Sequence, residues 1–252
     1  MQYTLKKSLG QHFLKDENIS RKIADALVKH SFSQLLEIGP GAGALTKFLL
    51  QFDNIDFKAI EFDEEKVAYL LHAFPPIKDK IIHGDILKAA VPFENNFAVI
   101  GNFPYNISSQ ILFKILEWKE QVAFVIGMFQ KEVAQRIASK PNTKVYGILS
   151  VLVQAFYDVE YLFDVPASAF NPPPKVISGV IELTRKNETT KIKSEKDFFL
   201  LVKTAFNQRR KKMRNAVRHL FTEDILQHEI FDKRAEQLSV KDFAALTFKM
   251  QS

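Results

Sequence analysis

The sequence predicts an α/β fold in which helices cover a mostly parallel, doubly wound sheet. Short apolar runs alternate with amphipathic segments over most of the chain, which is the pattern of repeated strand–helix units. The first apolar run leads into a glycine-rich loop, and the runs after it end in acidic or amide residues. Because parallel strands end at one edge of such a sheet, we expect these residues to share a ligand site.

Apolar runs and capping residues place the individual elements. Asp63 is a typical N-cap for the helix that follows it. The last two apolar runs have no obvious helix between them and are expected to form an antiparallel edge of the sheet. Helices are expected at residues 20–30, 44–52, 63–72, 108–118 and 131–139, and strands at 34–38, 56–60, 80–83, 97–100, 122–128, 149–156 and 176–183.

The chain is expected to contain two domains. Its 252 residues suit one large domain, or a medium domain with a smaller one. The polar stretch 185–193 has the composition of a linker, and the pattern after it is wholly helical. We therefore predict an α/β domain over residues 1–187 and a small all-helical domain over residues 188–252.

Composition favours a cytoplasmic protein with an acidic partner. No stretch approaches the roughly 18–20 uncharged apolar residues of a membrane span, and the first residues lack the apolar region of a signal peptide. The absence of Cys excludes disulfides and thiolate zinc sites, and we expect no metal. The net charge is +6, and residues 198–222 hold seven Lys or Arg but no Asp or Glu. Lys6, Lys7 and Lys15 begin a second basic region.

A loop with three glycines predicts a binding site for a nucleotide-like cofactor. Residues 37–43 read Glu-Ile-Gly-Pro-Gly-Ala-Gly between a strand and a helix. Gly39 and Gly41 let the backbone approach a ligand closely beside the helix N-terminus. An ordinary strand-to-helix turn is the alternative. The spacing G-x-G-x-G differs from the G-x-G-x-x-G of dinucleotide-binding proteins.

Acidic residues after the next two strands extend this site. Glu61 ends the second strand about 20 residues after the glycine loop, where a carboxylate can accept both hydroxyls of a ribose. Asp85 follows the third strand and is placed to accept a hydrogen bond from an adenine amino group, while Ile86 packs on the ring. A turn or helix cap is an equally good interpretation of Asp85. An adenosine-bearing cofactor without a pyrophosphate fits these groups, and S-adenosylmethionine is the leading candidate.

Residues 102–105, Asn-Phe-Pro-Tyr, follow the fourth strand and are expected at the same edge; we call them the acceptor loop. The side-chain carbonyl of Asn102 and the backbone carbonyl of Phe103 can accept both N–H groups of an exocyclic amine. Pro104 keeps the loop extended, and Tyr105 can stack on a base. Hydrogen-bond acceptors at this place also stabilise the positive charge that builds on the amine nitrogen when it attacks an electrophile. A turn with an aromatic side chain in the core is the alternative.

Taken together, these motifs resemble those of one family. The segments 37–43, 84–87 and 101–108 are similar to motifs of the adenine-N6 dimethyltransferases of ribosomal RNA. Within that family the resemblance is to the housekeeping small-subunit enzymes (the KsgA/RsmA family). It rests there on Lys-Ser-Leu-Gly-Gln-His-Phe-Leu at 7–14, Ala-Phe-Asn-Pro-Pro-Pro-Lys-Val at 169–176 and Ala-Phe-Asn-Gln-Arg-Arg-Lys-Lys-Met-Arg-Asn at 205–215.

The resemblance implies a Rossmann-like, S-adenosylmethionine-dependent catalytic domain that dimethylates two adjacent adenosines in the 3′-terminal hairpin loop of 16S rRNA. Residues 1–18 are then expected to cover the cofactor. Members of the family often have Asn where this chain has His12. Phe170 resembles a second aromatic that sandwiches the target base with Tyr105, although core packing is an equally good interpretation. The implied cofactor contacts are His12, Leu14, Gly39, Gly41, Glu61, Asp85, Ile86 and Asn102.

The basic C-terminal segment is expected to bind RNA. A helix over residues 208–219 is predicted to hold rRNA phosphates, which positions the substrate and makes binding sensitive to salt. The resemblance implies that the partner is 16S rRNA in a late assembly intermediate of the small ribosomal subunit, and we expect a monomer. The predicted phosphate-binding residues are Arg209, Arg210, Lys211, Lys212 and Arg214.

Three other functions were weighed against the pattern. A 23S rRNA adenine methyltransferase of the macrolide-resistance type shares the cofactor motifs and the acceptor loop, but the segments 9–14 and 207–215 favour the small-subunit enzyme. A ribosome-assembly factor that has lost catalysis is disfavoured by the intact glycine and acceptor loops. A DNA adenine methyltransferase is disfavoured because no separate base-reading domain is visible.

Overall fold

The computed structural model describes residues 12–251, which divide into two compact units. The first unit contains the residues up to 134 together with 160–185, and the second contains 135–159 and the residues from 186 onward. The predicted boundary between 187 and 188 lies close to the observed division after Arg185. Residues 135–159 were predicted in the first domain, but the structure groups them with the C-terminal helices in the second unit. Lys6, Lys7 and most of the expected cofactor-covering segment lie outside the described residues.

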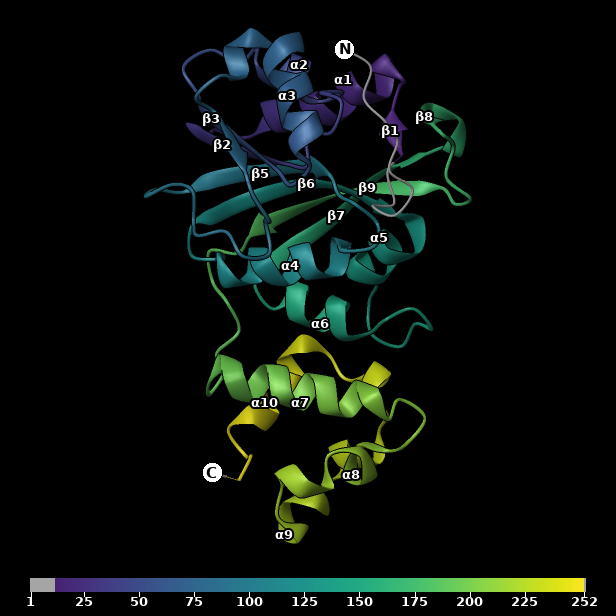
Figure 1. Cartoon of the computed structure of the whole chain (residues 1–252). Helices are drawn as coiled ribbons and strands as arrows, with labels where there is room; N and C mark the ends of the chain where they lie inside the picture. The colour runs from purple at the N-terminus through teal and green to yellow at the C-terminus, as the bar shows by residue number, and fades with distance from the viewer. Residues whose placement is uncertain (1–11, 252) are drawn as a thin grey trace. The chain divides into compact units, whose positions relative to one another are not determined.

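A seven-stranded sheet dominates the first unit (Figure 1), with the strand order β4-β3-β2-β5-β6-β9-β7. Strands β4, β3, β2, β5 and β6 run parallel to one another, and β9 is antiparallel to β6. The predicted mostly parallel sheet is confirmed. The strands are β2 Gln34–Ile38, β3 Asp56–Glu61, β4 Ile81–His83, β5 Phe97–Asn102, β6 Val122–Gln130, β7 Tyr157–Val165 and β9 Ser178–Arg185, and a separate pair is formed by β1 Phe13–Leu14 and β8 Phe170–Asn171.

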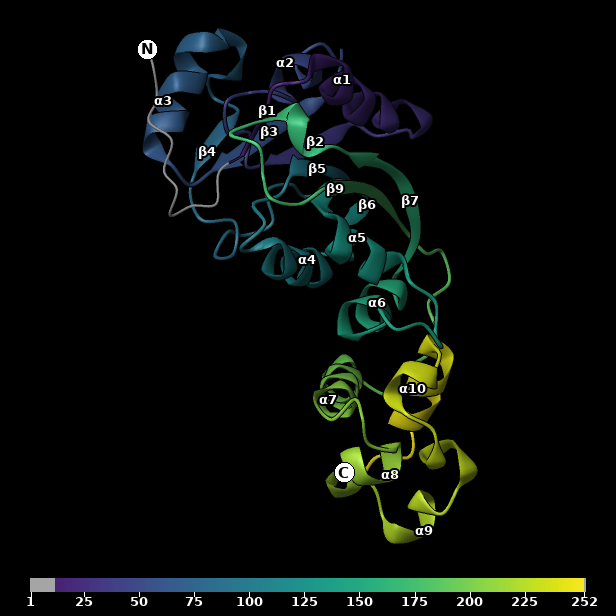
Figure 2. The same cartoon turned by 90° about the vertical axis from the view of Figure 1, so that its right-hand side faces the viewer.

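Helices cover both faces of this sheet. Helices α1, α2 and α3 lie on one face and α4 lies on the other, as both views show (Figures 1 and 2). Asp16 caps α1 by accepting from the N–H groups of Asn18 and Ile19, and Asp63 caps α3 as predicted. The helices are α1 Glu17–Asp25, extended by a 3₁₀ turn Ala26–Lys29, α2 Thr46–Leu49, α3 Glu64–Ala73, α4 Ser108–Glu117 and α5 Lys131–Ala138.

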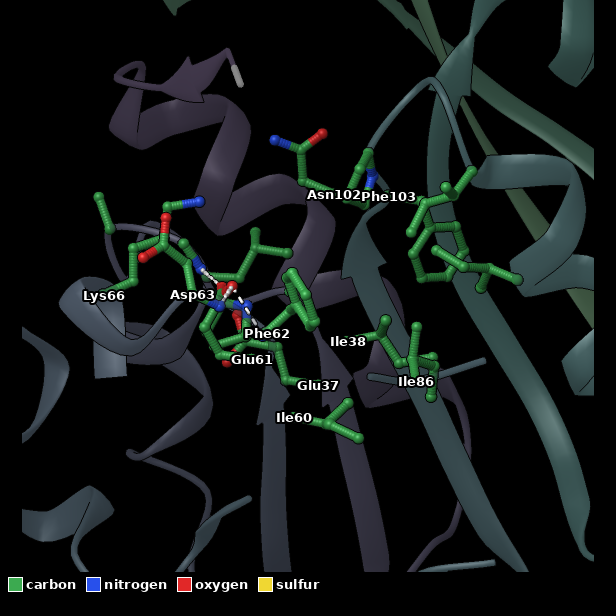
Figure 3. Close-up of a pocket in the computed structure, with 18 of the residues that line it drawn as sticks. Glu37, Ile38, Ile60, Glu61, Phe62, Asp63, Lys66, Ile86, Asn102 and Phe103 are labelled. Carbon is green, nitrogen blue, oxygen red and sulfur yellow. Dashed lines mark hydrogen bonds between the residues drawn. The ribbon is translucent and has the colours of Figure 1, made fainter. Parts of the chain in front are cut away.

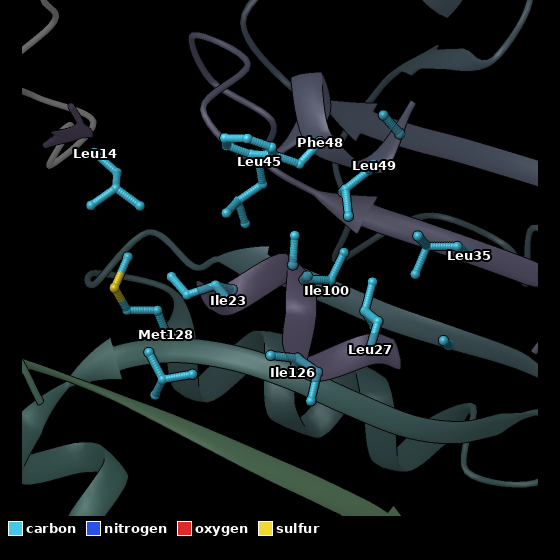
Figure 4. Packing of buried hydrophobic residues seen from close by; sticks show 14 of the residues in the cluster. Leu14, Ile23, Leu27, Leu35, Leu45, Phe48, Leu49, Ile100, Ile126 and Met128 are labelled. Atoms are coloured by element: carbon cyan, nitrogen blue, oxygen red, sulfur yellow. The ribbon is translucent and has the colours of Figure 1, made fainter. Parts of the chain in front are cut away.

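The main hydrophobic core lies between the sheet and helices α1 to α3 (Figure 4). Leu35, Ile100 and Ile126 come from three neighbouring strands, and Ile23 and Leu27 of α1 belong to the same buried cluster. Burying side chains of this size contributes about 1.5–3 kcal/mol each. This packing holds the strands in register and so fixes the places where their carboxyl ends emerge.

The second unit is helical. Helices α7 and α10 pack on each other and on α6. The ring of Phe206 lies between those of Tyr146 and Phe243, with ring centroids 6.1 and 5.9 Å apart. Among the helices that the structure describes, none has the length and apolar character needed to cross a membrane. The helices of this unit are α6 Ile148–Gln154, α7 Glu195–Asn207, α8 Met213–Ala216, α9 Glu223–Leu226 and α10 Val240–Thr247.

The strand expected at residues 149–156 is wrong, because this segment forms helix α6. A short, wholly apolar run does not distinguish a buried strand from a buried helix. The strand that the prediction lacks is β7, which directly follows α6. There the acidic side chains of Asp158 and Asp164 are exposed while Tyr157 and Val165 are buried, so the strand lacks a continuous apolar run.

Phe103 ties the acceptor loop to the sheet. Its ring is fully buried, at 0% exposure, and packs edge-on against Phe129 of β6 with ring centroids 5.0 Å apart. A Cβ atom added to Gly101 would come within 2.6 Å of this ring, and one added to Gly127 within 2.7 Å. The two glycines on β5 and β6 therefore provide the space that the Phe103 ring fills.

We expect Gly127→Ala to lower the free energy of unfolding by about 1–3 kcal/mol, because the added methyl group overpacks this space. Urea denaturation measures the change. Gly84→Ala is the matched control, since an added Cβ at Gly84 has no atom within 4 Å. Equal effects of the two substitutions would contradict this account of the packing.

Candidate functional site

A cavity of about 290 Å³ lies at the carboxyl ends of β2, β3 and β5 in the first unit (Figure 3). Ile38, Ile60 and Ile86 give it an apolar wall. The structure brings the predicted cofactor residues together there, although they come from five separate segments of the chain. The lining includes His12, Leu14, Gly39, Gly41, Glu61, Asp85, Ile86, Asn102, Phe103, Pro104 and Tyr105.

The glycine loop has a backbone conformation that other residues rarely adopt. Gly39, Gly41 and Gly43 have φ angles of +67°, +59° and +81°. A Cβ added to Gly41 would contact the Phe13 ring at 3.5 Å, and one added to Gly43 would meet the Phe74 ring at 2.2 Å. Three alternating left-handed residues are more than an ordinary strand-to-helix turn requires, so the structure favours the ligand-loop interpretation.

Glu61 is held in place by three backbone donors. Its Oε2 atom accepts from the N–H of Gly41 at 3.1 Å, and its Oε1 atom accepts from the N–H groups of Phe62 and Asp63 at 2.9 and 3.0 Å (Figure 3). A carboxylate offers about four acceptor positions. These bonds therefore fix the carboxylate opposite the glycine loop and leave it able to accept from a ribose hydroxyl.

Glu37 is a buried acid in the same cavity wall. Its side chain is 1% exposed. Burial raises the pKa of Glu37 from 4.5 to about 8, and the nearby Glu61 charge adds to the rise. The Thr46 hydroxyl donates to Glu37 Oε2 at 2.7 Å, which opposes it. Glu37 is therefore mainly protonated at neutral pH, and it joins the end of β2 to the start of α2.

Asp85 caps its own turn, because its Oδ1 atom accepts from the N–H of Leu87 at 2.9 Å. The capping interpretation is thus confirmed. Asp85 also lines the cavity beside the buried Ile86, so its contact with an adenine amino group stays a prediction.

The acceptor loop is rigidly supported. Asn102 ends β5, and its Nδ2 atom donates to the backbone carbonyl of His12 at 3.4 Å, which turns Oδ1 away from that contact. The Phe103 N–H donates to the Met128 carbonyl at 3.2 Å. The hydroxyl groups of Tyr105 and Ser178 are hydrogen-bonded at 2.5 Å. Burial raises the pKa of Tyr105 while this bond opposes the rise, so the phenol is neutral at physiological pH.

Strand β1 brings the N-terminal residues to the cavity. It pairs with β8, with Phe13 opposite Asn171 and Leu14 opposite Phe170. His12 and Leu14 both line the cavity, and Leu14 is also part of the hydrophobic core. Their predicted contacts with the cofactor are not yet tested.

Phe170, the predicted second stacking residue, is buried. The side chain is 1% exposed and belongs to the main core cluster, so its stacking on a base stays a prediction. Core packing, the other interpretation of this residue, is what the structure supports. Its packing anchors β8, and through β8 it anchors β1.

The continuous basic helix expected at residues 208–219 is wrong. Helix α7 ends at Asn207, the Lys211 N–H donates to the Gln208 carbonyl in a turn at 2.8 Å, and the four-residue α8 and a 3₁₀ turn Arg218–Leu220 follow. Lys212 also forms an isolated antiparallel β-bridge with Arg234. This backbone contact holds the segment against a part of the unit that is distant in sequence. These tertiary contacts override the helical pattern.

Three of the five predicted phosphate-binding residues have acidic partners within the second unit. Arg209 pairs with Glu236 at 3.0 Å and donates to the Lys144 carbonyl at 2.7 Å. Lys212 and Arg214 pair with Asp232 at 2.9 and 2.7 Å, and the hydrogen bond from Lys212 lowers the pKa of that carboxyl. Arg210 and Lys211 are exposed and have no such pair among the described residues.

Phe62 and Lys66 are among the cavity residues that the sequence interpretation missed. Phe62 follows Glu61 and keeps 63% of its side chain exposed although it lines the cavity, and Lys66 of α3 is buried there over the Phe13 ring at 5.2 Å. The position of Phe62 directly after Glu61 was a usable signal. Nothing local marks Lys66, because its burial depends on the packing of β1.

The residues present fit an adenosine-bearing cofactor. The cavity combines an apolar wall for a flat ring with carboxylates at the ends of two strands and backbone N–H groups at the glycine loop. The Rossmann-like sheet and this edge define an S-adenosylmethionine-dependent methyltransferase. Bound there, the cofactor supplies an activated methyl group.

The chain belongs to the ribosomal RNA adenine dimethylase family, whose model matches residues 2–250. It is 55% identical over 251 residues to the ribosomal RNA small subunit methyltransferase A of Flavobacterium johnsoniae, covering 98% of this chain and 96% of the relative. It is 54% identical over 246 residues to the protein of the same name from Cytophaga hutchinsonii, covering 96% and 95%.

Two solved structures share the fold over nearly the whole chain. A dimethyladenosine transferase from Plasmodium falciparum is 26% identical with a TM-score of 0.78, covering 92% of this chain and 94% of the other. The 23S rRNA methyltransferase ErmE is 22% identical with a TM-score of 0.69, covering 95% and 100%. The second likeness shows the fold alone.

We expect Glu37→Gln to change how stability depends on pH. Between pH 4.5 and about 8 the unfolded chain releases the Glu37 proton while the folded chain keeps it, so the contribution of Glu37 to wild-type stability falls as pH rises. Glu37→Gln lacks this loss. Its free energy of unfolding relative to wild type should therefore increase by up to about 1.4 kcal/mol for each pH unit.

Urea denaturation of both proteins from pH 5 to 8 measures this difference. Glu94→Gln is the control, because Glu94 is exposed. A constant difference between Glu37→Gln and wild type across the range would contradict the raised pKa.

Proposed function

We propose that this chain transfers methyl groups from S-adenosylmethionine to N6 of two adjacent adenosines in the 3′-terminal hairpin loop of 16S rRNA. The observation that carries the proposal is the acceptor loop, which lies in the wall of the cofactor cavity with Asn102 at a strand end. The names of the relatives, which are at least 50% identical over almost the whole chain, support the small subunit as the substrate.

The acceptor loop is suited to hold an amine. The contact between Asn102 Nδ2 and the His12 carbonyl leaves Oδ1 to accept one N–H of the adenine amino group. We assign the second N–H to the Phe103 carbonyl. Both acceptors favour the positive charge that builds on nitrogen during attack. Methyl transfer then depends on alignment more than on a strong base, and the proton leaves after attack.

Tyr105 is placed to receive the base. A paired or stacked adenine must leave its stack to reach an enclosed site, and stacking on an aromatic ring is worth about 1–3 kcal/mol. The bond to Ser178 fixes the Tyr105 ring before the base arrives. Accepting two methyl groups per adenine requires that the loop also hold N6-methyladenine.

We propose that a monomer acts in the cytoplasm, on a late assembly intermediate of the small subunit. Incubation of isolated small and large subunits with radiolabelled cofactor tests the choice of substrate. Label in large subunits alone would favour a 23S rRNA enzyme, and label in neither would favour a non-catalytic assembly factor.

Asn102→Ala should reduce the rate of methyl transfer by about 100-fold or more, because it removes one acceptor for the developing charge. Cofactor affinity, measured by calorimetry, should fall by much less than the rate. Asn95→Ala, in an exposed loop, is the control. Full dimethylation by Asn102→Ala at the wild-type rate would contradict the role of the amide.

Arg210 and Lys211 are proposed to contact rRNA phosphates. Replacing both with Ala should weaken RNA binding and reduce the slope of log affinity against log salt by about 2, since two phosphate contacts are lost. Filter binding over a salt series measures this. The control is the double substitution Lys241→Ala with Lys249→Ala, which removes the same charge from exposed sites in the same unit. Equal losses in both double variants would show that only net charge matters.

A further inference from the structure

Residues 140–144, Lys-Pro-Asn-Thr-Lys, lie in the connection between α5 and α6 and belong to the second unit; we call them the α5–α6 loop. The loop is part of a long segment, residues 133–157, that contains no Asp or Glu. The stretch 198–222, which includes the basic turn after α7, contains none either. The chain therefore has another acid-free segment besides the one that was expected to bind RNA.

The structure fastens the α5–α6 loop to the basic turn. The Nη2 atom of Arg209 donates to the Lys144 carbonyl at 2.7 Å and to the Thr143 carbonyl at 3.4 Å. Its Nε atom donates to Glu236 Oε2 at 3.0 Å, and the Asn142 N–H donates to the Glu236 carbonyl at 2.8 Å. Because a guanidinium presents its donors in a rigid plane, these bonds hold the loop and the turn in one arrangement.

The acids that reach this surface are already paired. Glu236 is paired with Arg209. Asp232 is paired with Lys212 and Arg214. Neither carboxylate is therefore left to neutralise the other cations of the loop and the turn.

Four cations on the two connected segments stay available to a ligand. Each is exposed and has no acidic partner within residues 12–251. They are Lys140 and Lys144 in the α5–α6 loop and Arg210 and Lys211 in the turn. Two cationic segments that are bonded together suit an extended polyanion, such as RNA with its regularly spaced phosphates.

We propose that the α5–α6 loop is a second phosphate-binding element, in which Lys140 and Lys144 contact the backbone of the RNA substrate beside Arg210 and Lys211. The inference rests on the proposed function and adds a surface to it. Arg209 holds the loop through backbone carbonyls, so the side chains of both lysines are left for phosphate. Such contacts position an RNA without reading its sequence.

The test compares wild type with the double substitution Lys140→Ala and Lys144→Ala, the loop variant. Filter binding of undermethylated small subunits is measured between about 50 and about 200 mM salt, the range over which phosphate contacts weaken strongly. Methyl transfer to the same subunits gives KM and kcat, and calorimetry gives cofactor affinity. The control is Lys241→Ala with Lys249→Ala, which removes the same charge from exposed sites of the same unit.

We expect the slope of log affinity against log salt to be smaller in the loop variant by about 1.4 to 2, since two phosphate contacts are lost. Over this fourfold salt range, its affinity should then fall by a factor about 7 to 16 times smaller than that of wild type. KM for the subunits should rise while kcat stays within about twofold, because the lost contacts bind substrate and transition state equally. The control and the cofactor affinity should match wild type.

Three results would overturn the assignment. Wild-type affinity and slope in the loop variant would mean that Lys140 and Lys144 contact no phosphate. The same change of slope in the control would reduce the effect to net charge. A loss of affinity with an unchanged slope would make the loop a contact for a ribosomal protein. All three leave methyl transfer by wild type intact. If wild type neither binds nor methylates the subunits, the proposed function fails and the role of the loop falls with it.

Discussion

The burial of Phe103 is the constraint on which the acceptor site depends. The ring fills a space that Gly101 and Gly127 leave open in adjacent strands and packs against Phe129. The side chain is thereby drawn into the core while its backbone stays at the edge of the sheet. This explains why a loop that needs only to turn contains a Phe: the ring anchors it, so that the Asn and Tyr on either side have fixed positions.

The cofactor half of the site depends on the same edge of the sheet. Glu61 is oriented by N–H groups from the glycine loop and from its own turn. Glu37, one strand away, is kept protonated by burial, which lowers the density of negative charge in the cavity wall. The two acids therefore differ in charge although both lie at the carboxyl ends of their strands: Glu37 is neutral and bonded to Thr46, and Glu61 is the one predicted to contact the cofactor.

Much of the fold and the cavity could be predicted from sequence because the signals are local. A glycine loop after a strand, or a carboxylate at a strand end, can be recognised from a few neighbouring residues. These signals predicted the mostly parallel sheet and the clustering of Gly39, Glu61, Asp85 and Asn102. Prediction failed where tertiary contacts decide. The wholly apolar run in α6 fits a helix as well as a strand, and the burial of Phe170 depends on its pairing across β1.

The basic segment shows the same limit. Its charge was visible in the sequence, but the ion pairs of Arg209, Lys212 and Arg214 join residues 18 to 27 positions away, which no local pattern reveals. The predicted phosphate-binding residues that lack an acidic partner among the described residues are thus Arg210 and Lys211. A long basic run is therefore a weaker guide to an RNA surface than the small number of cations that lack acidic partners.

The most direct test of the central claim is mass mapping of methylated nucleotides after undermethylated small subunits are incubated with this protein and S-adenosylmethionine. We predict N6,N6-dimethyladenosine at two adjacent positions in the 3′-terminal hairpin of 16S rRNA, and at no other site. Methylation elsewhere, or only a single methyl group on each adenosine at completion, would contradict the account.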